Sequence, residues 1–349
     1  MPDPKRDREN DFRSYPALSR PVVQNGYGRS ALYSPRHRPG PLVAWHLLSV
    51  LPAAVAVYAI LSGYMALTLT RPVRLPFERS PDQYGLNFES VSFPSRIDAI
   101  KLDGWLLPVT GSQRRPVVIV HGKGSDRQQE VGGRVLEIAR ALVLDGHPVL
   151  MFDLRGSGRS GGDHFTLGAE EVRDLGGAID FLEKRGLASR GVDLLGYSMG
   201  AATAMLEAAA DPKVNVVAED SGYATLGEVV EDQVPKASGL PSVFTPGVVL
   251  AARLLIGIDV YSIRPIDAAR TLAARGIPLL VIHGEADTMI PVINGHTLAA
   301  AYGSKVASYF VPGAEHVGSY PANPEAYLSH LTAFFDRSET QNPELRTQN

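Results

Sequence analysis

The sequence contains a five-residue motif that is typical of a nucleophilic serine. Gly196-Tyr-Ser198-Met-Gly200 follows the apolar run 192–195 and precedes the alanine-rich stretch 201–210. A tight turn between strand and helix exposes the serine hydroxyl above a sheet, and the two glycines remove Cβ atoms that would collide there. A chance glycine turn with a surface serine is the simpler interpretation. The flanking strand and helix favour the nucleophile.

A nucleophilic serine needs a base that is oriented by an acid. Asp287 and His316 follow the serine in the chain, each a few residues beyond an apolar run. The order serine, acid, histidine, with each residue after a strand, is the order expected for such a triad. A loop aspartate or a lone histidine is more often structural, and Glu285 is an alternative acid. Three coincidences in one order favour Ser198, Asp287 and His316 as catalytic residues.

The chemistry also requires donors for a developing oxyanion. The backbone N–H of Met199, directly after the serine, is the first candidate. The second should come from the loop after an early strand, here the small-residue segment 121–126. We expect the backbone N–H of Lys123 to supply it, with the lysine side chain facing solvent or an anionic group of the substrate.

Other kinds of site find less support in the sequence. Residues 156–161 match the glycine pattern of a dinucleotide site, but no helix follows directly, so a tight loop held by Asp153 and Arg155 is expected. The other histidines lack metal-ligand spacing and the chain has no cysteine, so we expect neither metal nor cofactor. The net charge of −3 gives no reason to expect a nucleic-acid partner.

Short apolar runs alternate with amphipathic stretches over most of the chain, and these elements must position the site. Strands alternating with helices predict an α/β protein with a mostly parallel sheet and helices on both faces. The expected strands are 90–93, 99–107, 116–120, 148–152, 192–196, 214–218, 278–282 and 307–311. The expected helices are 129–145, 168–186, 199–210, 265–275, 291–302 and 323–336. The first two strands should pair antiparallel through a turn near Asp98.

One segment breaks this alternation. Residues 221–264 contain no clear strand and include the apolar run 248–258. We expect this segment to be an insertion that forms a lid.

The first 84 residues differ in composition from the rest. Residues 1–41 carry eight Lys or Arg and four Asp or Glu, which predicts a disordered basic tail. The 29 residues 42–70 are uncharged and would form a helix about 43 Å long, enough to span a bilayer and too long for a signal peptide. Residues 71–84 are expected to be a linker, and residues 338–349 a polar tail after a folded domain at 85–337.

The charge around the uncharged stretch predicts an orientation. Counting the whole tail, basic residues are more numerous before the stretch than after it. The positive-inside rule then places the N-terminus in the cytoplasm and the C-terminal domain outside it. We therefore expect a single-pass membrane protein.

Taken together, these pieces resemble the α/β-hydrolase superfamily over residues 85–337. The resemblance rests on His121-Gly122, the block 153–160, the serine motif, 283–287 and 313–316. Arg264-Pro265 before the acid-bearing strand is similar to the membrane-anchored, Bem46-like group. The resemblance implies an eight-stranded, mostly parallel sheet and a serine hydrolase. Lys123 and Gly124 depart from the asparagine and alanine that are frequent after His-Gly there.

The expected activity is hydrolysis of a carboxylester, lipid ester or thioester through an acyl-enzyme on Ser198. A small-peptide hydrolase is the nearest alternative, in which Glu219 and Asp220 would hold a substrate amine. A catalytically silent scaffold on the same fold and a haloperoxidase-like side activity stay open. The sequence leaves the acyl length, leaving group and oligomeric state undetermined.

Overall fold

The computed structural model describes residues 41–340, apart from residues 73 and 112 and the side chains of 41–49. The expected tails 1–41 and 338–349 therefore lie largely outside the described residues. By compactness the chain divides into residues 1–51 and residues 52–349. The second unit contains the sheet, its helices and the candidate site.

Helix α1 (Pro41–Thr70) covers the uncharged stretch and contains Pro52. Its window Val50–Thr70 is long and apolar enough to cross a membrane, and only 11% of that window is buried. The core helix of a soluble domain would be mostly buried, so this exposure needs another explanation. Proline inside a helix of this kind is tolerated in membranes.

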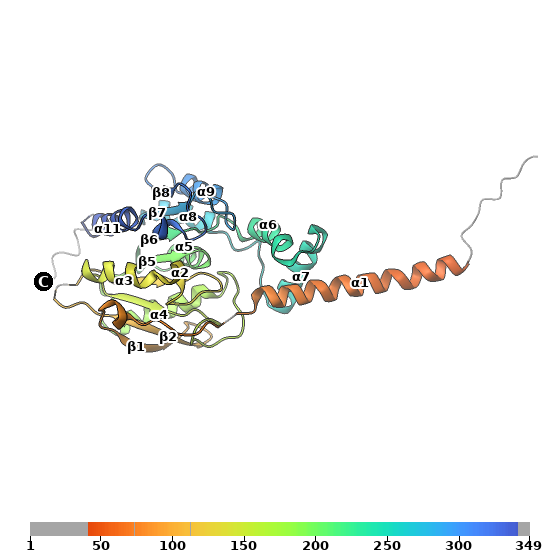
Figure 1. Cartoon of the computed structure of the whole chain (residues 1–349), viewed down its shortest axis with the longest axis horizontal. Coiled ribbons are helices and arrows are strands. Elements are labelled where there is room, and N and C mark those ends of the chain that lie inside the picture. The colour runs from red at the N-terminus through yellow and green to blue at the C-terminus, as the bar shows by residue number, and fades with distance from the viewer. Residues whose placement is uncertain (1–40, 73, 112, 341–349) are drawn as a thin grey trace, which may run out of the picture. The chain divides into compact units, whose positions relative to one another are not determined.

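An eight-stranded sheet forms the centre of the second unit (Figure 1). Its strands are β1 (Glu89–Pro94), β2 (Lys101–Leu107), β3 (Val117–Val120), β4 (Val149–Phe152), β5 (Val192–Tyr197), β6 (Val214–Asp220), β7 (Leu279–Gly284) and β8 (Ala307–Val311). The spatial order is β1-β2-β4-β3-β5-β6-β7-β8, and β2 pairs antiparallel with both of its neighbours. The remaining pairs are parallel. This confirms the predicted mostly parallel sheet and its antiparallel opening.

Helices cover both faces of this sheet. One face packs on α4 (Glu171–Lys184), α5 (Met199–Ala210), α8 (Pro265–Arg275) and α9 (Ile293–Tyr302). The other packs on α3 (Val135–Leu144) and α11 (Pro324–Thr340), with the short α10 (Ser319–Ala322) beside α11. Because both faces are covered, the central strands are buried throughout, as in β3 and β5.

The helix expected over 129–145 is interrupted. A short turn, α2 (Glu130–Gly133), precedes α3, and Val131 and Gly132 have φ of 57° and 63°. These left-handed conformations cannot continue a right-handed helix. The prediction of one continuous helix was therefore wrong at its start.

The expected insertion contains two helices and no strand. Helix α6 (Leu226–Ser238) is followed by the turn η2 (Ser242–Phe244) and helix α7 (Thr245–Leu255). Buried side chains of both helices form a cluster with Ala66 of α1 and with Tyr223. We call residues 226–255 the lid segment.

The segments that flank the expected domain also contact it. Within the expected linker, Arg74 donates to the carbonyl oxygens of Ser157, Gly158 and Gly162. A short turn, η1 (Pro81–Tyr84), ends this segment. Helix α11 continues to Thr340 and so enters the expected tail. Its extension is held by polar contacts with the domain that composition alone does not reveal.

Candidate active site

Ser198 lies at the sharp turn between β5 and α5. Its φ of 51° and ψ of −115° are strained for a residue with a Cβ atom. The backbone N–H of Ser198 donates to the carbonyl oxygen of Asp220 at 2.9 Å, which ties the turn to β6. A Cβ atom on Gly196 would overlap Gly200, and one on Gly200 would overlap the backbone of β3. The two motif glycines are thus required by close backbone approach.

The structure brings Ser198, His316 and Asp287 together in one hydrogen-bonded chain. The Ser198 Oγ atom lies 2.9 Å from His316 Nε2, and His316 Nδ1 lies 2.7 Å from Asp287 Oδ2. The Asp287 side chain is fully buried, whereas the His316 side chain is 17% exposed. With the proton on Nδ1 donated to the carboxylate, Nε2 is free to accept the serine proton. This geometry suits nucleophilic attack by the serine.

Asp287 is fixed as an anion by its surroundings. Its Oδ1 atom accepts the backbone N–H groups of Met289 and Ile290 at 2.9 and 2.8 Å. Burial opposes ionisation, but hydrogen bonds from His283 and His316 outweigh it and lower the pKa of Asp287 to about 2. The alternative acid, Glu285, is exposed and has no hydrogen bond to His316. The carboxylate beside the histidine therefore belongs to Asp287.

A polar relay behind the triad was missed by the sequence reasoning. Val317, next to the histidine, has φ of 53°, and its N–H donates to Ser221 Oγ at 3.1 Å. Ser221, also left-handed at 61°, donates in turn to Asp220 Oδ1 at 2.9 Å. The loop that carries His316 is thereby anchored to the end of β6. The signal in the sequence was only a polar pair after a strand, which is common.

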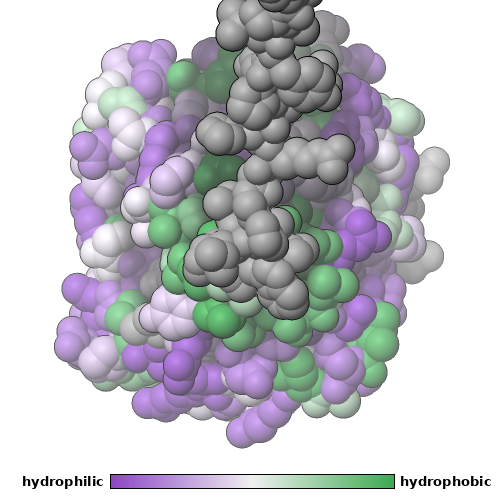
Figure 2. Space-filling model, turned by 90° about the vertical axis from the view of Figure 1, so that its right-hand side faces the viewer, coloured by the Kyte–Doolittle hydropathy of each residue, from purple (hydrophilic) through white to green (hydrophobic). Residues whose placement is uncertain are grey.

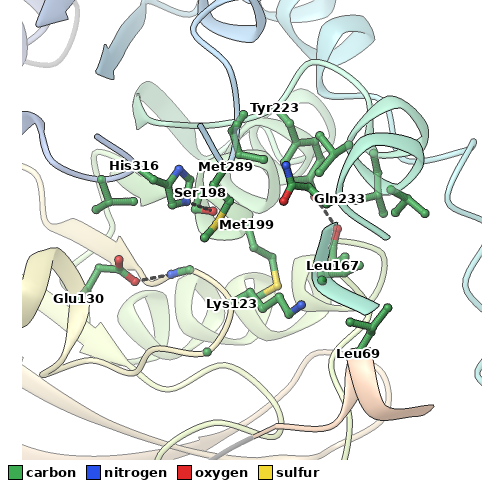
Figure 3. Close-up of a pocket in the computed structure, with 18 of the residues that line it drawn as sticks. Leu69, Lys123, Glu130, Leu167, Ser198, Met199, Tyr223, Gln233, Met289 and His316 are labelled. Carbon is green, nitrogen blue, oxygen red and sulfur yellow. Dashed lines mark hydrogen bonds between the residues drawn. The ribbon is translucent and has the colours of Figure 1, made fainter. Parts of the chain in front are cut away.

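Near Ser198, the backbone N–H groups of Met199 and Lys123 have no hydrogen-bond acceptor among the described residues. The neighbouring N–H of Gly122 is instead bound by the Glu130 carboxylate (Figure 3). Burial raises the pKa of Glu130, although the hydrogen bond from Gly122 opposes this. Glu130 thus holds the loop of Lys123 close to the serine and was also missed by sequence reasoning.

A cavity of about 540 Å³ opens over these groups. Ser198, Met199, His316 and Lys123 line it together with residues that are mostly apolar (Figure 3). The apolar lining includes Leu69, Leu167, Val230, Val234, Met289 and Ile290. Leu69 belongs to α1, so the apolar helix lines the cavity as well as preceding the domain. A mostly apolar cavity with a few convergent polar groups is typical of a small-molecule site.

Lys123 is the cation of this cavity. Its ammonium lies 5.4 Å from the ring centre of Phe165, and partial desolvation lowers its pKa. The side chain lies at the cavity wall and is also exposed to solvent. It is placed to meet an anionic group on a bound molecule.

The two acids expected to hold a substrate amine do not reach the cavity. Glu219 and Asp220 are fully buried and are absent from its lining. Burial raises their pKa values to about 8 and about 6. Glu219 accepts the N–H of Gly222 instead. The expectation that these residues bind an amine was wrong, because both carboxylates point into the fold.

The remaining sequence candidates act as loop supports. His121 accepts the N–H of Leu154 at 3.0 Å, and Asp153 binds Arg127 at 2.8 Å. The tight loop expected at residues 156–161 is present, with the N–H of Gly156 donating to the carbonyl oxygen of Gly161 at 2.7 Å, and Arg155 pairs with Asp174 of α4. A group of potential metal ligands, His147, Asp193 and Glu339, lies at the opposite ends of the strands. The Arg115 guanidinium, 2.8 Å from Asp193, already supplies positive charge there.

Parts of the chain are similar to known proteins. A family model described as serine aminopeptidase S33 matches residues 111–219. The uncharacterized protein YqkD of Bacillus subtilis is 29% identical over 198 residues, which cover 56% of this chain and 64% of that protein. The chain thus spans less than two thirds of this relative. The uncharacterized protein YfhR of Escherichia coli O157:H7 is 25% identical over 237 residues, covering 66% and 74%.

Solved structures establish the fold. The esterase PF2001 of Pyrococcus furiosus superposes with a TM-score of 0.64 at 23% identity, covering 77% of this chain and 97% of that one. Est1E of Butyrivibrio proteoclasticus, with ferulic acid bound, superposes with a TM-score of 0.57 at 18% identity, covering 71% and 99%. The chain has the α/β-hydrolase fold that the sequence predicted.

Proposed function

We propose that this protein is a membrane-anchored serine hydrolase that cleaves a carboxylester, lipid ester or thioester. The observation that carries the proposal is the hydrogen-bonded chain from Ser198 Oγ through His316 to Asp287 at the wall of an apolar cavity. A silent scaffold has no need of a strained serine, a fixed carboxylate and two free amides at one point.

The reaction proceeds in two acyl-transfer steps. His316 Nε2 takes the proton of Ser198 as Oγ attacks the acyl carbonyl, and the amides of Met199 and Lys123 stabilise the oxyanion. The imidazolium then gives its proton to the departing alkoxide or thiolate, which leaves an acyl-enzyme. Water attacks the acyl carbonyl with the same histidine as base, and the carboxylic acid and Ser198 are released. Asp287 stabilises the imidazolium throughout.

The lining of the cavity favours an acyl ester over a peptide with a free amine. Among the described residues, the acid that lines the cavity is Glu130, and its carboxylate is bound to Gly122. Lys123 adds a positive charge, which repels an amine. The apolar walls suit an acyl chain. We expect α1 to be a single membrane span with the hydrolase domain outside the cytoplasm.

The test uses the full-length chain in detergent and p-nitrophenyl esters with acyl chains of two to sixteen carbons. An aminoacyl anilide and an acyl thioester are measured beside them. We expect ester turnover that disappears in Ser198→Ala and persists in Ser304→Ala, an exposed serine on a turn far from β5 in the sequence. A fluorophosphonate should label the wild type and Ser304→Ala, and not Ser198→Ala.

Two results would decide against the proposal. Faster turnover of the anilide than of every ester would establish the peptide hydrolase. No turnover and no fluorophosphonate labelling of a folded wild-type chain would establish the scaffold. Membrane anchoring is tested separately by recovery of the protein in alkali-washed membranes, from which peripheral proteins are released.

A further inference from the structure

The lid helix α7 has an unusual outer surface. Thr245, Val248 and Ala252 form its buried face. Val249 and Ala251 are partly buried against the same cluster, whereas Leu250, Leu254 and Leu255 are exposed by 56%, 73% and 58%. Residues 250 and 254 are four apart and therefore stack on one side of the helix. An 11-residue helix with three exposed leucines needs a partner that is itself apolar.

The exposed leucines of α7 adjoin α1, since a Cβ atom on Gly63 of α1 would lie 3.6 Å from the Cδ1 atom of Leu255. The Tyr58 ring of α1 stacks on Phe244 with ring centres 4.9 Å apart. The Tyr58 hydroxyl donates to the carbonyl oxygen of Val243 and accepts the N–H of Gly247. Ser62 lies against Gly247, where a Cβ atom would overlap it. Figure 2 shows hydrophobic residues gathered on the face of the molecule that carries these elements.

The length of α1 fixes the depth of this contact. A span needs about 20 residues, and every run of that length within the 30-residue helix includes residues 51–60. Tyr58 therefore lies within the span wherever the bilayer sits along α1. Tyr58 contacts the start of α7. If α1 spans the bilayer, this end of α7 therefore lies at the edge of the hydrocarbon core or inside it. Helix α7, with 11 residues, is too short to cross, so beside a spanning α1 it would lie in the interface.

Helix α6 exposes more charged side chains than α7, which agrees with a position of α7 in the membrane interface. Helix α6 exposes Glu228, Glu231, Asp232 and Lys236, whereas Arg253 is the charged residue of α7. Lid residues Val229, Val230 and Val234 and residue Leu69 of α1 all line the catalytic cavity. The charged surface of α6 is thus suited to water, and the outer surface of α7 is suited to lipid. The inner side of the lid is suited to the bound acyl group.

We propose that the outer face of α7 is inserted in the membrane interface and that the cavity receives acyl lipids directly from the bilayer. This inference rests on the proposed function, since it assumes that α1 spans a membrane and that the site cleaves acyl esters. The partner is a lipid surface, chosen over a second copy of the chain because the face continues the surface of the candidate span.

The chain has no cysteine, so single labels can be introduced without background. Spin labels are attached to the full-length variants Leu254→Cys, Ile60→Cys in α1 and Leu144→Cys in α3, a control leucine that is 68% exposed. Each variant is reconstituted in vesicles of phosphatidylcholine and phosphatidylglycerol. Fluorophosphonate labelling of Ser198 checks that each is folded. Accessibility to oxygen, which enters hydrocarbon, is compared with accessibility to a polar nickel chelate, which does not.

We expect the ratio of oxygen to nickel accessibility at residue 254 to exceed that at residue 144 by about threefold or more, as polar solutes are excluded from hydrocarbon. A residue 254 label that behaves like residue 144, while residue 60 is in lipid, overturns the inference and leaves the anchor intact. A label at residue 254 that neither oxygen nor the nickel chelate reaches indicates a protein partner for α7. That result also overturns the inference that α7 lies in lipid. An aqueous label at residue 60 overturns the anchor itself, whereas the esterase assay is unaffected.

A functional measurement completes the test. The double variant Leu250→Glu, Leu254→Glu should turn over a long-chain ester in vesicles about tenfold more slowly, because charge is unfavourable in the interface. Its turnover of a soluble short-chain ester should match the wild type, and Leu144→Glu should change neither. Equal loss on both substrates would mean that α7 acts on the chemistry or the fold and not on lipid access.

Discussion

Replacing Asp287 by asparagine should inactivate the enzyme without unfolding it. The Oδ1 atom accepts two backbone amides, from Met289 and Ile290. In Asp287→Asn these amides hold the carbonyl oxygen of the asparagine in the same place, which turns its NH2 group toward His316. The amide then donates to His316 Nδ1, so the ring proton moves to Nε2. In that tautomer the histidine cannot accept the proton of Ser198.

The structure sets a range for the loss. The pKa of Asp287 falls from 3.8 to about 2, which corresponds to about 2 kcal/mol in favour of the charged form. Because this shift also includes His283 and the backbone amides, loss of the electrostatic support of His316 alone would slow the reaction by at most about 30-fold. Inversion of the histidine tautomer raises the expected loss in kcat toward about 10⁴-fold, the effect known for this substitution in serine proteases. KM should change little, because Asp287 does not line the cavity.

The assay measures kcat and KM for a short p-nitrophenyl ester, with the melting temperature as a check on folding. Glu285→Gln is the matched control, because Glu285 is exposed and lies two residues away. We expect it to keep kcat within about twofold, as is usual for surface substitutions. A folded Asp287→Asn variant that retains more than about a tenth of wild-type kcat would refute the assignment, and a matching loss in Glu285→Gln would transfer the role to that acid.

Burial and close contact lead to three further predictions. Burial raises the pKa of Glu219 from 4.5 to about 8, so the folded state keeps a proton that the unfolded chain releases and stability falls as pH rises through this window. Glu219→Gln should therefore raise the melting temperature at pH 8 and not at pH 4. Gly200→Ala should yield no folded protein, measured as soluble yield, because its Cβ atom would overlap the carbonyl oxygens of Val120 and His121. Lys123→Ala keeps its backbone N–H, so turnover of a neutral ester should persist while an ester with a carboxylate-terminated acyl chain loses about two- to fivefold in kcat/KM, the value of one exposed ion pair of about 0.5–1 kcal/mol.

The strands and the triad were predictable because both depend on local pattern. A strand buried on both faces must be apolar throughout, so the run 116–120 locates β3 to within a residue. Ser198, Asp287 and His316 each follow such a run, and parallel strands bring the ends of those runs to one edge of the sheet. The three residues were therefore predictable because each lies only a few positions after its strand in the sequence.

The supports of the site were not predictable in this way, since they depend on contacts between distant segments. Glu130 reads as an ordinary acid at a helix start, yet it binds Gly122 within the fold. Ser221 reads as a turn residue, yet it holds the N–H of Val317. Leu69 reads as part of an anchor, yet it lines the cavity. Each side chain has a common local explanation, and only the three-dimensional packing supplies the second partner.

Backbone strain explains why these supports are needed. Of the six non-glycine residues with positive φ in the described chain, Val131, Leu167, Ser198 and Val317 line the cavity. Each such conformation costs about 1–3 kcal/mol and persists only where its surroundings enforce it. At Ser198 and Val317 the enforcing bonds run to Asp220 and Ser221, which leave the sheet at the same strand end. The geometry of Ser198, His316 and Asp287 is therefore held by the end of β6 in the sheet and does not depend on the lid segment for these bonds.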